Sequence, residues 1–201
     1  MGAAEPIDRS PRALLLTGIQ GSGKTTVGRA LAERLSRSAF IEGDALWKMV
    51  VGDRADMSGD PTPEALAQLD LRFRHGALLS GSFVRAGFVA IHVDNVYGPR
   101  IIEQLAMLDV PAALVVLRPS PAAVVRRERD RGTSAYVGWV DGSGDDGLRA
   151  AVERFDLWLV EGAPADQGLW LDTSEQTVDE TVDAILARWE EAVVPLETTP
   201  P

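Results

Sequence analysis

Three glycines, a lysine and two threonines lie close together in residues 18–26, which read GIQGSGKTT. Their spacing fits the pattern G-x-x-x-x-G-K-[ST], in which glycines let the backbone fold so that successive N–H groups point at one anion. A helix that starts directly after the loop would add the positive end of its dipole. We therefore predict a phosphate-binding loop whose ligand-contacting residues are Gly18, Gly21, Ser22, Gly23, Lys24, Thr25 and Thr26.

The lysine and the first threonine of this loop have distinct expected roles. Lys24 is expected to reach the β and γ phosphates of a nucleoside triphosphate, most simply ATP, and to act in catalysis. Thr25 is expected to place its hydroxyl on Mg²⁺. Lysine occurs at only two positions of the chain, Lys24 and Lys48, so its presence in a glycine-rich loop carries weight. The alternative is that the glycines form only a turn and that Lys24 is a solvated helix residue.

Two carboxylates follow the next apolar run, in the segment FIEGDALWK. Glu42 and Asp44 would lie at the carboxyl end of a parallel strand, where open α/β sheets bind their ligands. Residues i and i+2 of a strand share a side, so both carboxylates could face the phosphates. Asp44 could then accept a proton from an alcohol while Glu42 orients water on the metal. Alternatively, Asp44 only caps a helix that begins at Ala45.

Short apolar runs alternate with helical patterns along the chain, which predicts βαβ units and an α/β fold. We expect the three-layer P-loop NTPase fold, with a five-stranded parallel sheet flanked by helices on both faces. The predicted strands are 13–17, 39–42, 88–93, 112–117 and 169–172, and the predicted helices are 24–35, 61–85, 99–108, 121–131 and 178–191.

Two loops rich in Gly, Asp and Ser, residues 51–63 and 130–147, are longer than typical connections and could cover a bound substrate. The second directly follows an arginine cluster and is the stronger lid candidate, with a plain surface loop as the alternative. We expect residues 1–194 to form a single domain with an acceptor-binding region at about 45–85, and residues 195–201 to form a disordered tail.

Composition excludes several classes of protein. Thirty acidic residues stand against 20 basic ones, and this net charge of −10 argues against nucleic acid as a partner. The chain has no cysteine, which excludes disulfides and thiolate metal sites. It has no apolar run long enough to cross a membrane and no apolar signal core at its start, so we expect a cytoplasmic protein without membrane contacts. The sequence leaves the formation of homo-oligomers open.

Five motifs together resemble the small P-loop kinases of the shikimate kinase, gluconate kinase and chloramphenicol phosphotransferase kind, within the nucleoside monophosphate kinase-like fold. The motifs follow in order along most of the chain and are GIQGSGKTT (18–26), EGDAL (42–46), HVDNV (92–96), RRERDRG (126–132) and LDTS (171–174). The first is specific for nucleotide, whereas the others depend on their order and spacing.

The resemblance implies roles at matching positions. Asp44 would be the catalytic base, Glu42 would be its acidic partner near the metal, and Asp94 would contact Mg²⁺ through water, with a simple turn residue as the alternative for Asp94. Arg127 would stack on adenine, and Arg131 would bridge phosphates, since guanidinium is planar and bidentate toward phosphate. Solvated positions at a helix end are the alternative for these arginines.

Departures from the family patterns limit what can be said of the acceptor. Trp47 stands where gluconate kinases continue with histidine, which argues against gluconate. Aromatic and basic side chains in the acceptor-binding region suit an amphipathic or anionic small molecule, although most could equally be core or surface residues. They are Trp47, Met49, Met57, Arg72, Phe73, Arg74 and His75.

The sequence therefore predicts an ATP-dependent, Mg²⁺-dependent phosphotransferase that acts on a hydroxyl of a small molecule, such as an antibiotic or a metabolite. The absence of an N-K-x-D motif, and Asn95 rather than glutamate after Asp94, argue against a GTP switch and against a water-activating ATPase. A non-catalytic nucleotide-binding switch, a partner-dependent ATPase and a polynucleotide 5′-hydroxyl kinase remain as alternatives.

Overall fold

The computed structural model describes residues 7–10, 12–132, 136, 138–139 and 145–195. Five parallel strands form a sheet in the order β2-β3-β1-β4-β5, and a short sixth strand pairs antiparallel with β4. The strands are β1 (Ala13–Thr17), β2 (Ser38–Glu42), β3 (Val89–Val93), β4 (Ala112–Leu117), β5 (Leu169–Leu171) and β6 (Val193–Val194). The predicted five-stranded parallel sheet is confirmed, and β6 is an addition to it.

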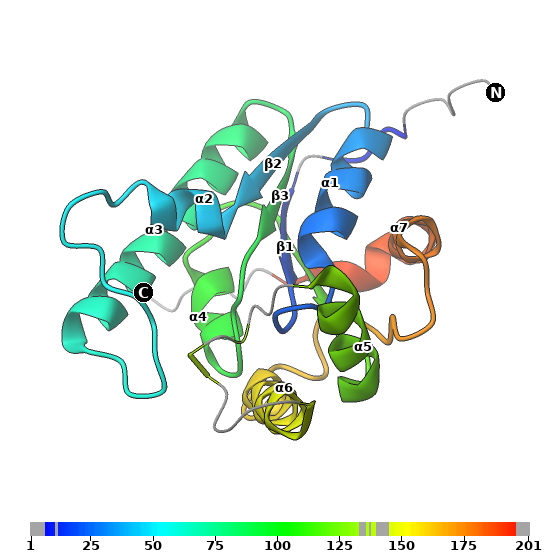
Figure 1. Ribbon diagram of the computed structural model, residues 1–201. Coiled ribbons are helices and arrows are strands. Elements are labelled where there is room, and N and C mark those ends of the chain that lie inside the picture. The colour runs from blue at the N-terminus through cyan, green and yellow to red at the C-terminus, as the bar shows by residue number, and fades with distance from the viewer. Residues whose placement is uncertain (1–6, 11, 133–135, 137, 140–144, 196–201) are drawn as a thin grey trace.

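Helices cover both faces of the sheet (Figure 1), as the predicted three-layer α/β fold requires. They are α1 (Lys24–Arg34), α2 (Gly43–Lys48), α3 (Pro63–Arg85), α4 (Arg100–Ala106), α5 (Pro121–Arg131), α6 (Asp145–Val160) and α7 (Val178–Ala187), followed by the 3₁₀ turn η1 (Trp189–Ala192). None of the helices in the described ranges is both long and apolar enough to cross a membrane.

Alternation along the central strands divides the core between the two faces. Leu14 and Leu16 of β1 pack with residues of α1 and α7, whereas Leu15 packs with residues of α3, α4, α5 and α6. All three side chains are at most 2% exposed. A strand that is buried on both faces has a continuous run of apolar residues, which is why β1 and β4 are easily recognised as strands in the sequence.

Helix α6 was missing from the sequence-based prediction, which assigned no element to residues 148–160. Its buried residues Val152, Phe155 and Leu159 have helical spacing, and they pack against the sheet with α5. The helical spacing was therefore present in the sequence. It was missed because it directly follows the residues that were assigned to the lid. Within that lid, residues 133–135, 137 and 140–144 lie outside the described residues, as do residues 196–201 of the predicted tail.

Helix α3 packs closely on β3 because residue 76 has no side chain. A Cβ built on Gly76 would lie 2.2 Å from Cε1 of His92, whose side chain is buried. Gly76→Ala is expected to destabilise the protein by about 1–3 kcal/mol through overpacking, which exceeds the ~0.5–1 kcal/mol that alanine gains in a helix. Urea unfolding measures this change, and Gly52→Ala, which meets open space, is the matched control that should leave the unfolding midpoint nearly unchanged.

Candidate active site

The loop between β1 and α1 has the conformation that its glycines predict. Gly18, Gly21 and Gly23 have positive φ angles of 151°, 77° and 93°. At Gly18 a Cβ would lie 2.4 Å from the carbonyl oxygen of Leu117, so the loop also lies too close to β4 for a side chain. The Oγ atom of Ser22 is buried and has no hydrogen-bond partner among the described residues. An orphaned hydroxyl in such a loop fits a bound phosphate oxygen.

Lys24, the first residue of α1, is 9% exposed, and its Nζ donates a hydrogen bond to the carbonyl oxygen of Ile19 at 3.1 Å. Burial lowers the pKa of Lys24 to about 8, although the carboxylates of Asp94 and Asp44 act in the opposite direction. The alternative of a solvated helix lysine is therefore wrong. A lysine with this pKa is still mostly charged at neutral pH and can bind phosphate.

The lowered pKa of Lys24 predicts a pH-dependent affinity for a nucleoside triphosphate. If the charged amine binds the phosphates and the neutral amine does not, the dissociation constant should rise about tenfold from pH 7 to pH 9. Calorimetric titration of ATP in a metal-free buffer measures this change and keeps metal hydroxide chemistry out of the readout. Lys24→Met should bind weakly with a flat profile over this range. An equally flat profile for the wild-type chain would contradict the assignment.

Glu42 and Asp44 line the same cavity as Lys24, but the local structure that brings them there differs from the prediction. The strand ends at Glu42 and helix α2 begins at Gly43, so strand alternation does not place Asp44. The helix cap is Glu42 and no side chain caps it, so the alternative role of Asp44 as a helix cap is also wrong. Gly43 permits this turn, since a Cβ there would lie 2.2 Å from Oδ2 of Asp94.

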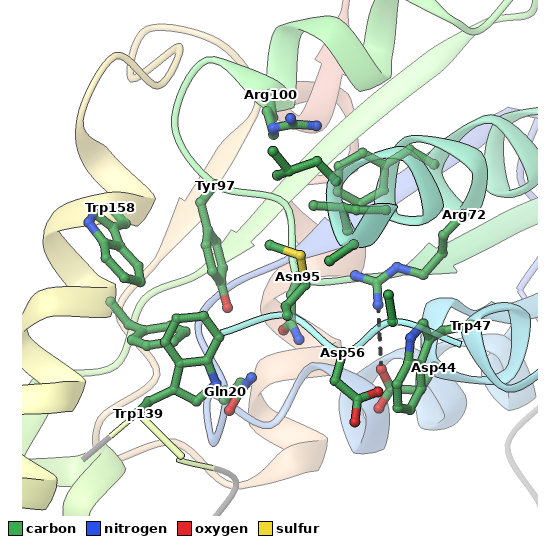
Figure 2. A pocket seen from close by; sticks show the side chains of 17 residues that line it. Gln20, Asp44, Trp47, Asp56, Arg72, Asn95, Tyr97, Arg100, Trp139 and Trp158 are labelled. Atoms are coloured by element: carbon green, nitrogen blue, oxygen red, sulfur yellow. Dashed lines mark ion pairs between the residues drawn. The ribbon is translucent and has the colours of Figure 1, made fainter. Parts of the chain in front are cut away.

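Arg72 of α3 connects two of the predicted acidic residues. Its guanidinium lies 2.7 Å from Oδ1 of Asp94, which is buried. It also lies 4.0 Å from Oδ1 of Asp44, which is 60% exposed (Figure 2). Burial tends to raise the pKa of Asp94, but the contact with His92, at 3.5 Å, and the charge of Arg72 lower it below its ordinary value. Asp94 is therefore ionised at neutral pH.

The predicted magnesium ligands fit the ion by their chemistry and position. Thr25, Glu42 and Asp94 line one cavity and offer the hard oxygen atoms that Mg²⁺ prefers. Oδ2 of Asp94 is buried, and among the described residues its polar contact is the long one of 3.5 Å with Nε2 of His92. The described residues contain no cluster of three or more carboxylate or imidazole ligands.

Both predicted arginines of α5 lie beside the phosphate loop. Arg127 donates hydrogen bonds to the carbonyl oxygens of Ser22 and of Thr173, which follows β5, and burial lowers its pKa. Arg131 lines the cavity that contains Lys24, and it pairs with Glu128 at 3.2 Å. The alternative of a solvated helix end therefore fails for Arg127, whereas Arg131 ends α5 and its side chain is 51% exposed. Arg127 contacts the backbone of the loop, and Arg131 lines the cavity that contains Lys24, whereas Arg127 does not.

Two cavities meet at Asp44. The first, of about 430 Å³, contains the phosphate loop, the predicted metal ligands and Arg131. The second, of about 380 Å³, lies between α2, α3 and α6. Gln20, Asp44, Trp47 and Asn95 line both cavities. A molecule in the second cavity would therefore present its end to the phosphate site beside the Asp44 carboxylate.

The second cavity contains part of the predicted acceptor-binding set and several residues that sequence reasoning missed. Trp47, Met57, Arg72 and Phe73 line it, whereas Met49, Arg74 and His75 are exposed and do not. The missed residues are Tyr97, Arg100, Trp139, Phe155 and Trp158. The apolar spacing of α6 could have indicated Phe155 and Trp158, but local sequence does not show on which side of the sheet α6 packs.

Protein-family models and curated proteins yield no match to this sequence. Solved structures do match over nearly the whole chain. A sugar kinase from Janibacter sp. HTCC2649 has a TM-score of 0.62 at 19% identity, covering 90% of this chain and 95% of its own. The Deinococcus radiodurans tunicamycin resistance protein has a TM-score of 0.60 at 21% identity, covering 93% and 99%.

A gluconokinase from Sinorhizobium meliloti 1021 also matches, with a TM-score of 0.56 at 22% identity, covering 90% of this chain and 94% of its own. At such identities the likeness establishes the fold. The order of strands, the phosphate loop after β1 and these matches agree with the resemblance found in the sequence. The chain therefore has the α/β fold of these structures, with a parallel sheet flanked by helices.

Proposed function

We propose that the protein transfers the γ-phosphate of ATP to a hydroxyl group of a small molecule, with residues 1–194 acting as one kinase domain. The observation that carries the proposal is the position of Asp44, where the phosphate cavity and the second cavity meet. A switch or an ATPase needs no second cavity beside its phosphates. An alcohol acceptor needs a cavity and a carboxylate at its inner end.

The transfer exchanges one bond to phosphorus for another. The acceptor oxygen forms a bond to the γ-phosphorus, the bond from that phosphorus to the β–γ bridging oxygen breaks, and ADP leaves. Asp44 takes the hydroxyl proton, as a general base within hydrogen-bond reach can. Lys24, Arg131 and the N–H groups of the loop stabilise the charge on the phosphoryl oxygens, which is where a loose transition state needs cations.

Thr25, Asp94 and Glu42 would hold Mg²⁺, directly or through water. The ion supplies charge neutralisation on the β and γ phosphates when it is bound. Arg72 keeps Asp94 ionised and contacts Asp44 as well, so it orients both carboxylates toward the phosphate site. Arg127 would flank the nucleotide base, since it lies on the outer side of the phosphate loop next to the segment after β5.

A transfer screen tests this proposal. The wild-type chain is incubated with γ-labelled ATP, Mg²⁺ and a panel of hydroxyl-bearing metabolites, antibiotics and a 5′-hydroxyl oligonucleotide, and labelled products are separated from ATP and free phosphate. The proposal expects label on at least one acceptor. Release of labelled inorganic phosphate alone would support an ATPase, and labelling of oligonucleotide 5′ ends alone would support a polynucleotide kinase.

A further inference from the structure

One side of the second cavity is a wall of aromatic rings from three elements. Phe155 and Trp158 lie on α6, Trp139 lies before it, and Tyr97 follows β3 (Figure 2). The ring centroid of Phe155 is 5.1 Å from that of Trp139, 4.9 Å from that of Trp158 and 5.9 Å from that of Tyr97. Rings in edge contact hold one another in place, so this wall is formed before any ligand binds.

Apolar side chains also line the opposite side. Leu66, Leu69 and Phe73 of α3 and Trp47 of α2 face the cavity. Trp158 is 37% exposed and Leu66 is 36% exposed, so part of this apolar surface is open to solvent. Apolar rings gathered around a hollow favour a ligand that removes them from water.

Each charged group at this cavity has an oppositely charged neighbour, including Asp56 beside Arg54 at 3.8 Å, although Nε of Arg72 donates no hydrogen bond to the described residues. Arg72 contacts Asp94 and Asp44, and Arg100 lies 2.6 Å from Oδ1 of Asp70. Asp44 and Asp56 are the carboxylates among the described lining residues, and Arg72 and Arg100 are the guanidinium groups, so their formal charges cancel. A carboxylate or phosphate on the acceptor would find no uncompensated cation here and would be repelled by Asp44.

Four buried polar atoms of the lining residues have no hydrogen-bond partner among the described residues: Nε of Arg72, the Tyr97 hydroxyl and, at the inner end, a side-chain oxygen each of Gln20 and Asn95. Oε1 of Gln20 and Oδ1 of Asn95 are buried, and neither receives a hydrogen bond from the described residues. Both residues line the junction with the phosphate cavity, next to Asp44. These oxygens can accept hydrogen bonds from an N–H or O–H group close to the reacting hydroxyl, while the rest of the ligand contacts rings.

We propose that the acceptor is an uncharged alcohol with a ring or another bulky apolar group, and that sugars, sugar acids and nucleotides are not acceptors. This inference rests on the proposed function and names its substrate class. The ring-lined wall, the paired charges and the two orphaned carbonyl oxygens at the inner end carry it. It narrows the sequence-based expectation of an amphipathic or anionic small molecule.

Binding and transfer are measured separately to test this inference. Tryptophan fluorescence reports binding, since Trp47, Trp139 and Trp158 line the cavity. The probes are 3-phenyl-1-propanol and cyclohexylethanol on one side and glucose and gluconate on the other, each with a non-hydrolysable ATP analogue present. Transfer from γ-labelled ATP to the same probes is then followed. We expect saturable binding of the two ring-bearing alcohols at least tenfold tighter than that of glucose or gluconate.

A matched pair of variants ties binding to the cavity. Leu66→Asp places a short charged group on the wall, and Leu78→Asp places the same group on α3 at a position that is 66% exposed and outside the cavity. Leu66→Asp should weaken binding of 3-phenyl-1-propanol at least tenfold, and Leu78→Asp should not. Both should bind the ATP analogue as the wild-type chain does, which shows that they are folded.

The outcomes separate this inference from the proposed function. Binding of the ring-bearing alcohols without transfer to any probe supports the cavity assignment and counts against the kinase. Transfer to glucose or gluconate in preference to the ring-bearing alcohols supports the kinase and overturns the inference. Equal binding to wild type and Leu66→Asp also overturns it, because the ligand would then lie elsewhere.

Discussion

Asp44→Asn is expected to lower the rate constant of phosphoryl transfer about 10³-fold while the dissociation constant for ATP changes less than about twofold. Asn keeps the size and hydrogen-bonding capacity of Asp but cannot take the proton of the attacking hydroxyl, and general bases contribute roughly 10²–10⁴-fold. The Asp44 side chain is 60% exposed, so its replacement by Asn disturbs no buried packing. The variant should therefore unfold at the same urea concentration as the wild-type chain.

Single-turnover transfer from γ-labelled ATP to the acceptor identified by the screen measures this rate constant. Asp109→Asn is the matched control, since Asp109 is an exposed carboxylate paired with Arg85 outside both cavities. A rate constant for Asp44→Asn within about fivefold of the wild-type value would remove Asp44 as the base. The ADP-release rate without acceptor should stay at its background level in both variants.

Lys24→Met is expected to lower the ratio kcat/KM for ATP by about 10³-fold. Lys24 is the buried cation at the phosphate end of the site, and loss of one charged donor to a transferring group costs about 10²–10³-fold in catalysis alone. Methionine retains the apolar stem of lysine and removes a charge whose burial is costly, as its lowered pKa shows. The variant should therefore fold at least as stably as the wild-type chain.

The combination of lost turnover and unchanged or raised stability separates this role from a structural one. Urea unfolding measures the stability, and steady-state transfer measures kcat/KM. Lys48→Met is the control, since Lys48 is the other lysine of the chain and lines neither cavity. Full activity of Lys24→Met would contradict the assignment of the phosphate loop, and a large loss of stability would show that Lys24 acts mainly in folding.

The sequence predicted the parts of the fold that depend on local pattern. The strands β1 and β4 have the predicted limits, because continuous apolar runs bounded by turn residues are distinctive. Helix α5 has both predicted limits, because Ser120 caps its start and Gly132, with φ of 71°, ends it. Strand β6 was missed because two residues are too few to produce a pattern.

Residues of the candidate site could be predicted only where they belong to one short sequence motif. Gly21, Gly23, Lys24 and Thr25 belong to one short motif, and all four line one cavity. The contacts of Arg72 with Asp44 and Asp94 join three elements that are 22 residues or more apart in the chain, and no local pattern specifies such pairs. The same holds for the ring wall, since its residues come from separate elements and meet only through sheet topology.

The central claim is that Asp44 lies between the two cavities, within reach of an alcohol aligned with the γ-phosphorus. A crystal structure with Mg²⁺ and a non-hydrolysable ATP analogue tests this claim most directly. The account predicts the γ-phosphate at Lys24 and a carboxylate oxygen of Asp44 about 5–6 Å from the γ-phosphorus, which leaves room for one hydroxyl. A carboxylate turned into solvent more than about 8 Å from the phosphorus, or a triphosphate bound away from Lys24, would contradict it.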